Sequence, residues 1–185
     1  MSPPILPPTL SPGRYLVQDV SVTRSFLTTD TSLEDPDPRA KFEPIVVLPG
    51  GVLSSIWEVA KNPNPDANGI TAGEFTVKVH NMPVIVSHNG MVVAFGSGGL
   101  FNDWNIQAHR IGTGEWCWSF GTKPGPEVFY WSVSHNPHDY DEHGHRRVVL
   151  KAVPRPTLRE LFVLTPLEPE TEITTQGAEE KADEA

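Results

Sequence analysis

Cysteine is nearly absent from this sequence, because Cys117 is the only one among 185 residues. An intrachain disulfide is therefore excluded, and we expect the chain to reside in a reducing compartment, the cytoplasm. Long hydrophobic runs are missing too, since no stretch reaches the roughly 18 apolar residues that span a bilayer. The N-terminus has neither the basic nor the apolar segment of a secretory signal peptide. These features predict a soluble protein with no membrane partner.

Basic residues are also few, because 14 Lys and Arg stand against 23 Asp and Glu, a formal net charge of −9. The last 18 residues, 168–185, hold seven acidic residues and one lysine, so −6 of that charge lies in the tail and −3 in the remainder. No basic face can be assembled, so nucleic acid is not an expected partner. The tail has few apolar residues and like charges, and we expect it to stay disordered.

Motifs of catalysis and cofactor binding are missing as well. The chain contains no Gly-x-Ser-x-Gly turn around a nucleophile, no phosphate-binding glycine loop and no dinucleotide fingerprint. Cys117 stands between two tryptophans in a strand-like run, which favours an ordinary core position. We expect a protein that is not an enzyme and that needs no cofactor.

Glycine, proline and aromatic residues are plentiful, with 15 Gly, 19 Pro, 5 Trp and 8 Phe. This composition favours an all-β protein with many turns over a helical one. Five of the prolines fall within residues 1–12, where they remove backbone donors and favour an extended arm that packs little.

Three segments share one pattern, an apolar run that ends in a turn and is followed by a second short strand. In the first, residues 45–48 run into Pro-Gly-Gly at 49–51, and Trp57 opens the second strand. The pattern returns over residues 91–106 and 148–164. We interpret each copy as a β-hairpin that buries one face.

A Gly-charged-aromatic triplet begins each of three units, at residues 13–15, 73–75 and 114–116. Each unit holds about four strands, and three such pseudo-repeats predict a β-trefoil over residues 13–167. In that fold six strands close a barrel and three hairpins cap its open end, so no edge strand is left exposed. A β-sandwich or another barrel is the alternative.

An aromatic residue closes each unit, and in a β-trefoil these residues meet near the axis of the barrel. We therefore expect the three closing residues to pack in the core and to take no part in binding: Trp57, Trp104 and Phe162.

The opening at residues 13–17, the segment 45–59 and the ending at 148–164 resemble the fungal β-trefoil protease inhibitors. The cospin-like serine protease inhibitors are the nearer comparison and the mycocypins a more distant one. The resemblance covers residues 13–167 and rests on core strands, which specify a fold better than a function. It implies inhibition of a protease, of the serine type, through surface loops and without catalytic residues.

The resemblance points to two loops as protease contacts. In the loop 34–43, a proline precedes a basic residue, and the candidate contacts are Pro38, Arg39, Ala40 and Lys41. Several carboxylates surround them, and a solvated arginine is the alternative interpretation. In the second loop Asn81 matches the residue that mycocypins present to the asparagine-specific protease legumain, although asparagine also suits a tight turn.

Histidines and carboxylates are concentrated between residues 135 and 147. The weak metal-ligand candidates are His135, His138, His143 and His145, which could take zinc or nickel. No fixed ligand spacing is present, however, and no metal is expected. A solvated loop that gains charge below about pH 6.5 is the alternative.

A carbohydrate-binding lectin is the rival function, because β-trefoils often bind sugars in shallow pockets with an aromatic residue and an Asp or Asn. Ricin-type lectins carry Gln-x-Trp near the end of each repeat. That motif is absent here, since Trp57 and Trp104 follow Ser-Ile and Asn-Asp. A carbohydrate partner through another kind of site stays open.

Overall fold

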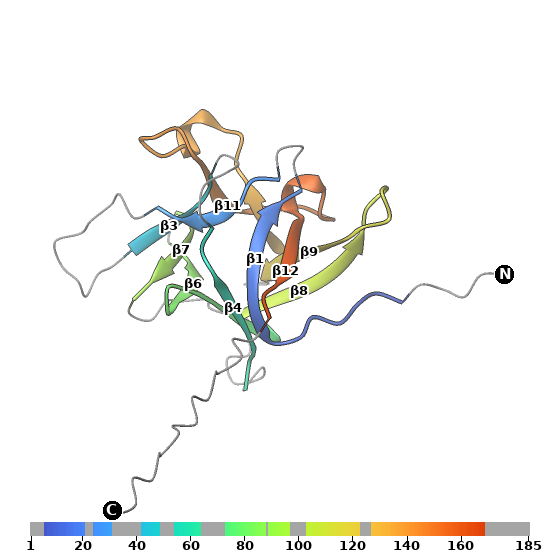
Figure 1. Cartoon of the computed structure of the whole chain (residues 1–185). Helices are drawn as coiled ribbons and strands as arrows, with labels where there is room; N and C mark the ends of the chain where they lie inside the picture. Colours follow the sequence, from blue (N-terminus) through green and yellow to red (C-terminus); the bar gives the residue numbers. More distant parts are fainter. Residues whose placement is uncertain are drawn as a thin grey trace, which may run out of the picture.

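The computed structural model describes residues 6–20, 24–30, 42–48, 54–63, 73–87, 89–96, 103–122 and 127–168. Over these ranges the chain is all-β, as predicted, with twelve strands and two short 3-10 helices (Figure 1). Within the same ranges no helix is long and apolar enough to cross a membrane.

The strands follow the alternation of apolar and polar residues in the sequence. In β5, Phe75, Val77 and Val79 are buried, while Lys78 between them is exposed, because successive side chains of a strand point to opposite faces. The elements are β1 (Gly13–Asp19), β2 (Leu27–Thr29), β3 (Phe42–Val47), β4 (Trp57–Lys61), β5 (Phe75–Val79), β6 (Met82–Val86), β7 (Val92–Phe95), β8 (Asp103–Arg110), β9 (Trp116–Thr122), β10 (Phe129–Val133), η2 (Pro137–Asp139), β11 (Arg146–Ala152), η3 (Leu158–Glu160) and β12 (Phe162–Pro166).

Six of the strands close into a ring. β1 pairs with β4, β4 with β5, and β5 with β8. β8 then pairs with β9, β9 with β12, and β12 returns to β1. All six pairings are antiparallel, so every strand of this barrel has a partner on both sides and no edge of the ring is left open.

The other six strands form three hairpins that lie against one another. β2 pairs with β3, β6 with β7, and β10 with β11. β3 pairs further with β7 and β11, and a bridge between Met91 and Val149 brings the second and third hairpins together. In Figure 1 β3, β6 and β7 lie together to the left of the ring strands β1 and β12. The hairpins therefore make a second layer beside the ring.

The hairpins predicted over residues 45–59, 91–106 and 148–164 are wrong. In the described part of the chain β3 does not pair with β4, β7 does not pair with β8, and β11 does not pair with β12. Each segment instead leaves the hairpin layer and enters the ring, where Trp57 pairs with Tyr15 and Val79. A turn motif in the sequence indicates a change of chain direction but does not determine with which strand the next strand pairs. The same local pattern therefore fits a hairpin and a strand that pairs elsewhere.

The core centres on Trp131 of β10, an aromatic residue that the sequence did not single out. Its ring centroid lies 5.9 Å from that of Trp57, 5.0 Å from that of Trp104 and 6.1 Å from that of Phe162. Phe120 stacks on it at 4.2 Å with the two rings nearly parallel. The three closing residues are fully buried, which confirms the prediction that they pack in the core.

Two indole N–H groups connect the six-stranded ring of the barrel to the hairpin layer. Nε1 of Trp57 donates to the carbonyl of Leu27 in β2 at 3.2 Å, and Nε1 of Trp104 donates to that of Val84 in β6 at 3.1 Å. Phe162 has no such donor, so the third unit lacks this link. The two bonds satisfy groups that would otherwise be costly to bury.

The predicted arm and tail are only partly described. Residues 6–9 are exposed as expected, but Leu10 is buried in the core, and the Tyr15 hydroxyl donates to the carbonyl of Ser11 at 2.5 Å. The arm therefore packs further than its prolines predict, because it carries an apolar side chain that can reach the core. Residues 1–5 and 169–185 lie outside the described ranges.

Candidate functional site

The turn between β5 and β6 consists of His80 and Asn81 alone, because Val79 pairs with Met82. Both residues have positive φ, 50° and 61°, as in the two-residue turns whose twist matches that of a hairpin. Asparagine suits this conformation, so the backbone gives a sufficient reason for Asn81, which is exposed.

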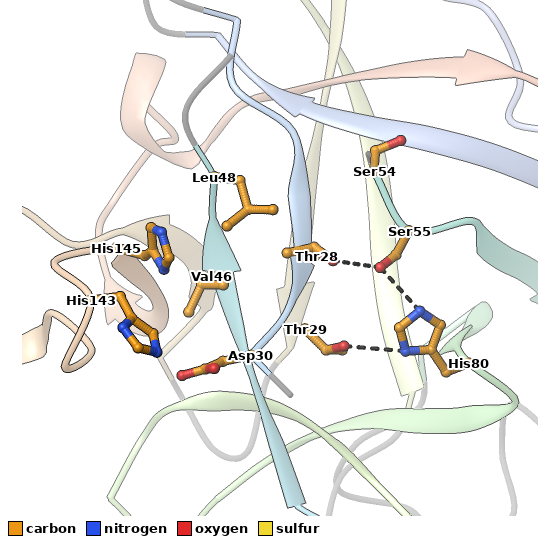
Figure 2. Close-up of a pocket in the computed structure, with 10 residues that line it drawn as sticks. All are labelled: Thr28, Thr29, Asp30, Val46, Leu48, Ser54, Ser55, His80, His143 and His145. Carbon is orange, nitrogen blue, oxygen red and sulfur yellow. Dashed lines mark hydrogen bonds between the residues drawn. The ribbon is translucent and has the colours of Figure 1, made fainter. Parts of the chain in front are cut away.

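A hydrogen-bonded cluster surrounds the His80 ring (Figure 2). Nδ1 of His80 lies 3.2 Å from the Thr29 hydroxyl and 3.4 Å from Oε2 of Glu43. Nε2 lies 3.2 Å from Oγ of Ser55, and that oxygen is 2.6 Å from the hydroxyl of Thr28. Both nitrogens of one imidazole are therefore held by side chains of other segments.

All residues of the cluster are buried except His80. Glu43 is 1% exposed, and Ser55, Thr28 and Thr29 are also buried. The side chain of His80, by contrast, is 44% exposed. Since a buried carboxylate needs compensating contacts, the imidazole beside Glu43 helps to stabilise it in an otherwise apolar strand.

An open pocket of about 500 Å³ lies over this cluster. In Figure 2 the side chains of Thr28 and Thr29 point toward Ser55 and His80 on one side, while His143 and His145 lie on the other. A neighbouring pocket of about 490 Å³ shares Ser55 and His80 with it. The cluster is thus reachable from two hollows of the surface.

The loop that carries His143 and His145 is organised around Asp141. Its buried carboxylate accepts from the amides of both histidines, at 2.9 and 2.6 Å, and from Nδ1 of His145 at 2.7 Å. Burial by itself would raise the pKa of Asp141, but the bonds from His145 and His143 outweigh it and lower that pKa. Three hydrogen bonds therefore connect this loop to Asp141, although the side chain of His143 is itself 55% exposed.

The four histidines do not converge on a metal site. His143 and His145 line the pocket, whereas His135 and His138 do not. Over the described ranges, no three or more His, Cys, Asp or Glu side chains are placed to hold a metal ion together.

The predicted contacts Pro38, Arg39, Ala40 and Lys41 lie outside the described residues, so they stay predictions. The strands on either side of this segment, β2 and β3, are described. Thr29 near the end of β2 and Glu43 near the start of β3 both contact His80. The turn that presents Asn81 is thus tied to the two strands that flank the other candidate loop.

Sequence reasoning did not find Glu43, Ser55 or His80 as a group. They come from three segments with no recognisable spacing, and only the fold brings them together. One signal was available, because Glu43 stands in a strand where its neighbours Ile45 and Val47 are apolar and point to the same face. A carboxylate at such a position indicates a buried polar contact.

The sequence matches no protein-family model and no curated protein. The structure is similar to that of a proteinase inhibitor from Coprinopsis cinerea, with a TM-score of 0.61 and 20% sequence identity over 86% of this chain and 100% of the inhibitor. It is also similar to a protein of unknown function from Caenorhabditis elegans, with a TM-score of 0.51 and 14% identity over 84% of this chain and 94% of the other. At these identities the likeness shows a shared fold.

Proposed function

We propose that this protein is a β-trefoil protease inhibitor that binds the active-site cleft of a serine protease through a surface loop. The observation that carries the proposal is the similarity to the Coprinopsis cinerea proteinase inhibitor, which extends over the full length of that protein. The closed ring of six strands and the layer of three hairpins support the β-trefoil assignment.

Inhibition of this kind needs a rigid support and no catalytic step. A loop that a rigid fold holds loses little conformational freedom on binding, so more of the contact energy appears as affinity. The flanking strands β2 and β3 pair with each other in the hairpin layer, and Trp57 of the six-stranded ring bonds to Leu27 of that layer, which together provide such a support. We assign the contact to Pro38, Arg39, Ala40 and Lys41, where a proline restricts the backbone before a basic side chain.

Asn81 is the second candidate, toward an asparagine-specific protease. Its φ of 61° belongs to a tight turn and not to the extended conformation in which a substrate enters a cleft. A substrate-like contact at Asn81 would need this turn to be rebuilt. We therefore consider the segment 38–41 a better candidate for the protease contact than Asn81.

Titration of trypsin with the wild-type protein tests the assignment. We expect inhibition by the wild type, and in Arg39→Ala or Lys41→Ala a loss of affinity of about 30-fold or more at the residue that makes the central contact. Arg155→Ala, which removes an exposed basic side chain far along the sequence, is the matched control and keeps full inhibition. Equal, negligible inhibition by wild type and variants would remove the proposal for trypsin-like proteases.

Carbohydrate binding is the alternative, and the pocket over His80 is the feature that favours it. Hydroxyls, imidazoles and the Asp30 side chain line this pocket, and they are groups that pair with sugar hydroxyls. Apart from imidazoles, its described lining contains no aromatic ring on which a sugar could stack. A glycan array separates the two functions, because specific sugar binding without inhibition of any protease favours the lectin.

A further inference from the structure

The His80 ring contacts Ser55 on one side and Glu43 on the other. A general base contacts its nucleophile and the carboxylate that orients it in the same way. We propose that Ser55 is an activated nucleophile that small activated esters acylate, with His80 as its general base and Glu43 as the residue that positions His80. This activity is separate from protease inhibition and does not depend on it.

The distances fit these roles. Oγ of Ser55 lies 3.2 Å from Nε2 of His80, within the range expected of a nucleophile and its base. The other ring nitrogen lies 3.4 Å from Oε2 of Glu43, and such contacts are often longer before a substrate is bound. The group is recognised by geometry and not by sequence order.

The surrounding hydroxyls favour the productive arrangement of protons. If Thr28 donates to Oγ of Ser55, the Ser55 proton is left to point at Nε2. Glu43 can only accept when ionised, so it favours the tautomer with the proton on Nδ1, and Thr29 can accept from the same N–H. Nε2 is then the free acceptor that a general base requires.

Access to the cluster also suits a small substrate. Ser55 itself is 6% exposed but lines both pockets, of about 500 and 490 Å³. The exposed His80 ring can exchange its proton with water. Glu43, in contrast, is buried, and burial strengthens its electrostatic effect on the imidazole.

A second Ser-His pair in the same molecule lacks these features. Oγ of Ser119 lies 2.8 Å from Nε2 of His109, but Ser119 is completely buried. Neither residue lines any of the described pockets, and among the described contacts no carboxylate reaches the His109 ring. Proximity of serine and histidine is thus not sufficient, and the pair Ser119-His109 serves as an internal comparison.

The reaction with p-nitrophenyl acetate balances with the groups present. Nε2 of His80 takes the hydroxyl proton as Oγ of Ser55 bonds to the acetyl carbon, the bond from that carbon to the phenolic oxygen breaks, and p-nitrophenolate leaves with the electron pair. The imidazolium then loses the proton to solvent. In the second step Nε2 takes a proton from a water molecule as the water oxygen bonds to the acetyl carbon, and the bond from that carbon to Oγ breaks. Oγ takes the proton back from the imidazolium, which restores Ser55, and acetic acid leaves and ionises to acetate.

Acetylation of the full-length protein by p-nitrophenyl acetate, followed by peptide mass mapping, tests the proposal. We expect an acetyl group on Ser55, none at this position in Ser55→Ala, and none on Ser119. Ser119→Ala is the matched control, because it removes the hydroxyl of the other Ser-His pair, which lines none of the described pockets, and it keeps the wild-type rate. Absence of acetyl-Ser55 in the wild type, together with release of p-nitrophenolate no faster than by Ser55→Ala, would overturn the proposal.

His80→Gly tests the base, because glycine accepts a φ of 50° and leaves room for a free imidazole. We expect acetylation of Ser55 to slow by about 100-fold or more and to recover in part when imidazole is added. An unchanged rate, or a slowed rate that imidazole does not raise, would contradict a base at His80.

Glu43→Gln tests the positioning role. If Glu43 acts only through His80, Glu43→Gln lowers the Ser55 acetylation rate of the wild type by about tenfold or more, but it makes no difference in His80→Gly without imidazole. An equal loss in both backgrounds would indicate a structural role for Glu43, and circular dichroism identifies a variant that does not fold.

Discussion

The aromatic core around Trp131 and the pocket at His80 are built from different kinds of contact. Trp131 is surrounded by aromatic rings from β4, β8, β9 and β12. The pocket takes its groups from strand ends and a two-residue turn, and its contacts are hydroxyl, imidazole and carboxylate. We therefore expect the aromatic core to determine stability and the pocket to provide the reactive groups.

Trp131→Ala has the largest expected effect on stability. We expect a loss of about 3–5 kcal/mol in the free energy of unfolding, because it removes the ring on which the others pack and leaves a cavity. Chemical denaturation measures it. Leu158→Ala, at a side chain that is 59% exposed, is the control and changes stability by less than about 0.5 kcal/mol. Similar losses in the two variants would mean that the core does not centre on Trp131.

Glu160 is a buried carboxylate, as Glu43 is, but its contacts indicate a structural role. It accepts from the Ser132 hydroxyl at 2.8 Å, and from the amide and hydroxyl of Thr157 at 2.9 and 2.6 Å. Glu160→Gln replaces an acceptor by a donor at one of these oxygens, and we expect a loss of about 1–3 kcal/mol at neutral pH. If stability stays unchanged at neutral pH, these bonds do not hold η3 in place.

The pH dependence of the same variant is a separate prediction. Burial would raise the pKa of Glu160, but the hydrogen bonds from Thr157 and Ser132 outweigh it and lower that pKa. A lowered pKa in the folded state stabilises the protein above the ordinary carboxyl range, and this contribution is lost as the pH falls through the folded-state value. The wild type therefore loses stability toward acid more steeply than Glu160→Gln. Parallel stability profiles of the two proteins would contradict this.

Among the substitutions at buried residues, Ser55→Ala gives the smallest change in stability, about 1 kcal/mol, because it removes hydrogen bonds at the margin of the core and leaves almost no cavity. The same substitution abolishes acetylation at that position. Thermal unfolding of this variant and of the wild type measures the loss. A loss as large as that of Trp131→Ala would place Ser55 among the residues that hold the fold.

The contrast also separates what sequence can predict from what it cannot. The burial of the aromatic closers Trp57, Trp104 and Phe162 follows from a local pattern, and the structure confirms it. Strand pairing is not local, and so the hairpin predicted over residues 45–59 is wrong although both of its strands exist.

The site was still less accessible to sequence reasoning. Glu43, Ser55 and His80 are separated along the chain, and each has an ordinary local explanation as a strand, loop or turn residue. Their meeting depends on how β3, the entry to β4 and the β5–β6 turn approach one another in three dimensions. Asn81 shows the reverse case, in which a residue singled out by resemblance has a sufficient reason in its backbone conformation.

Assays of the full-length protein against a panel of serine, papain-like and legumain-type proteases test the central claim most directly. The proposal predicts tight inhibition of a serine protease that is competitive with substrate and is weakened by Arg39→Ala or Lys41→Ala. The Ser55→Ala variant should inhibit as well as the wild type, which keeps the inhibitor proposal distinct from the serine chemistry. Failure to inhibit any protease of the panel would contradict the claim.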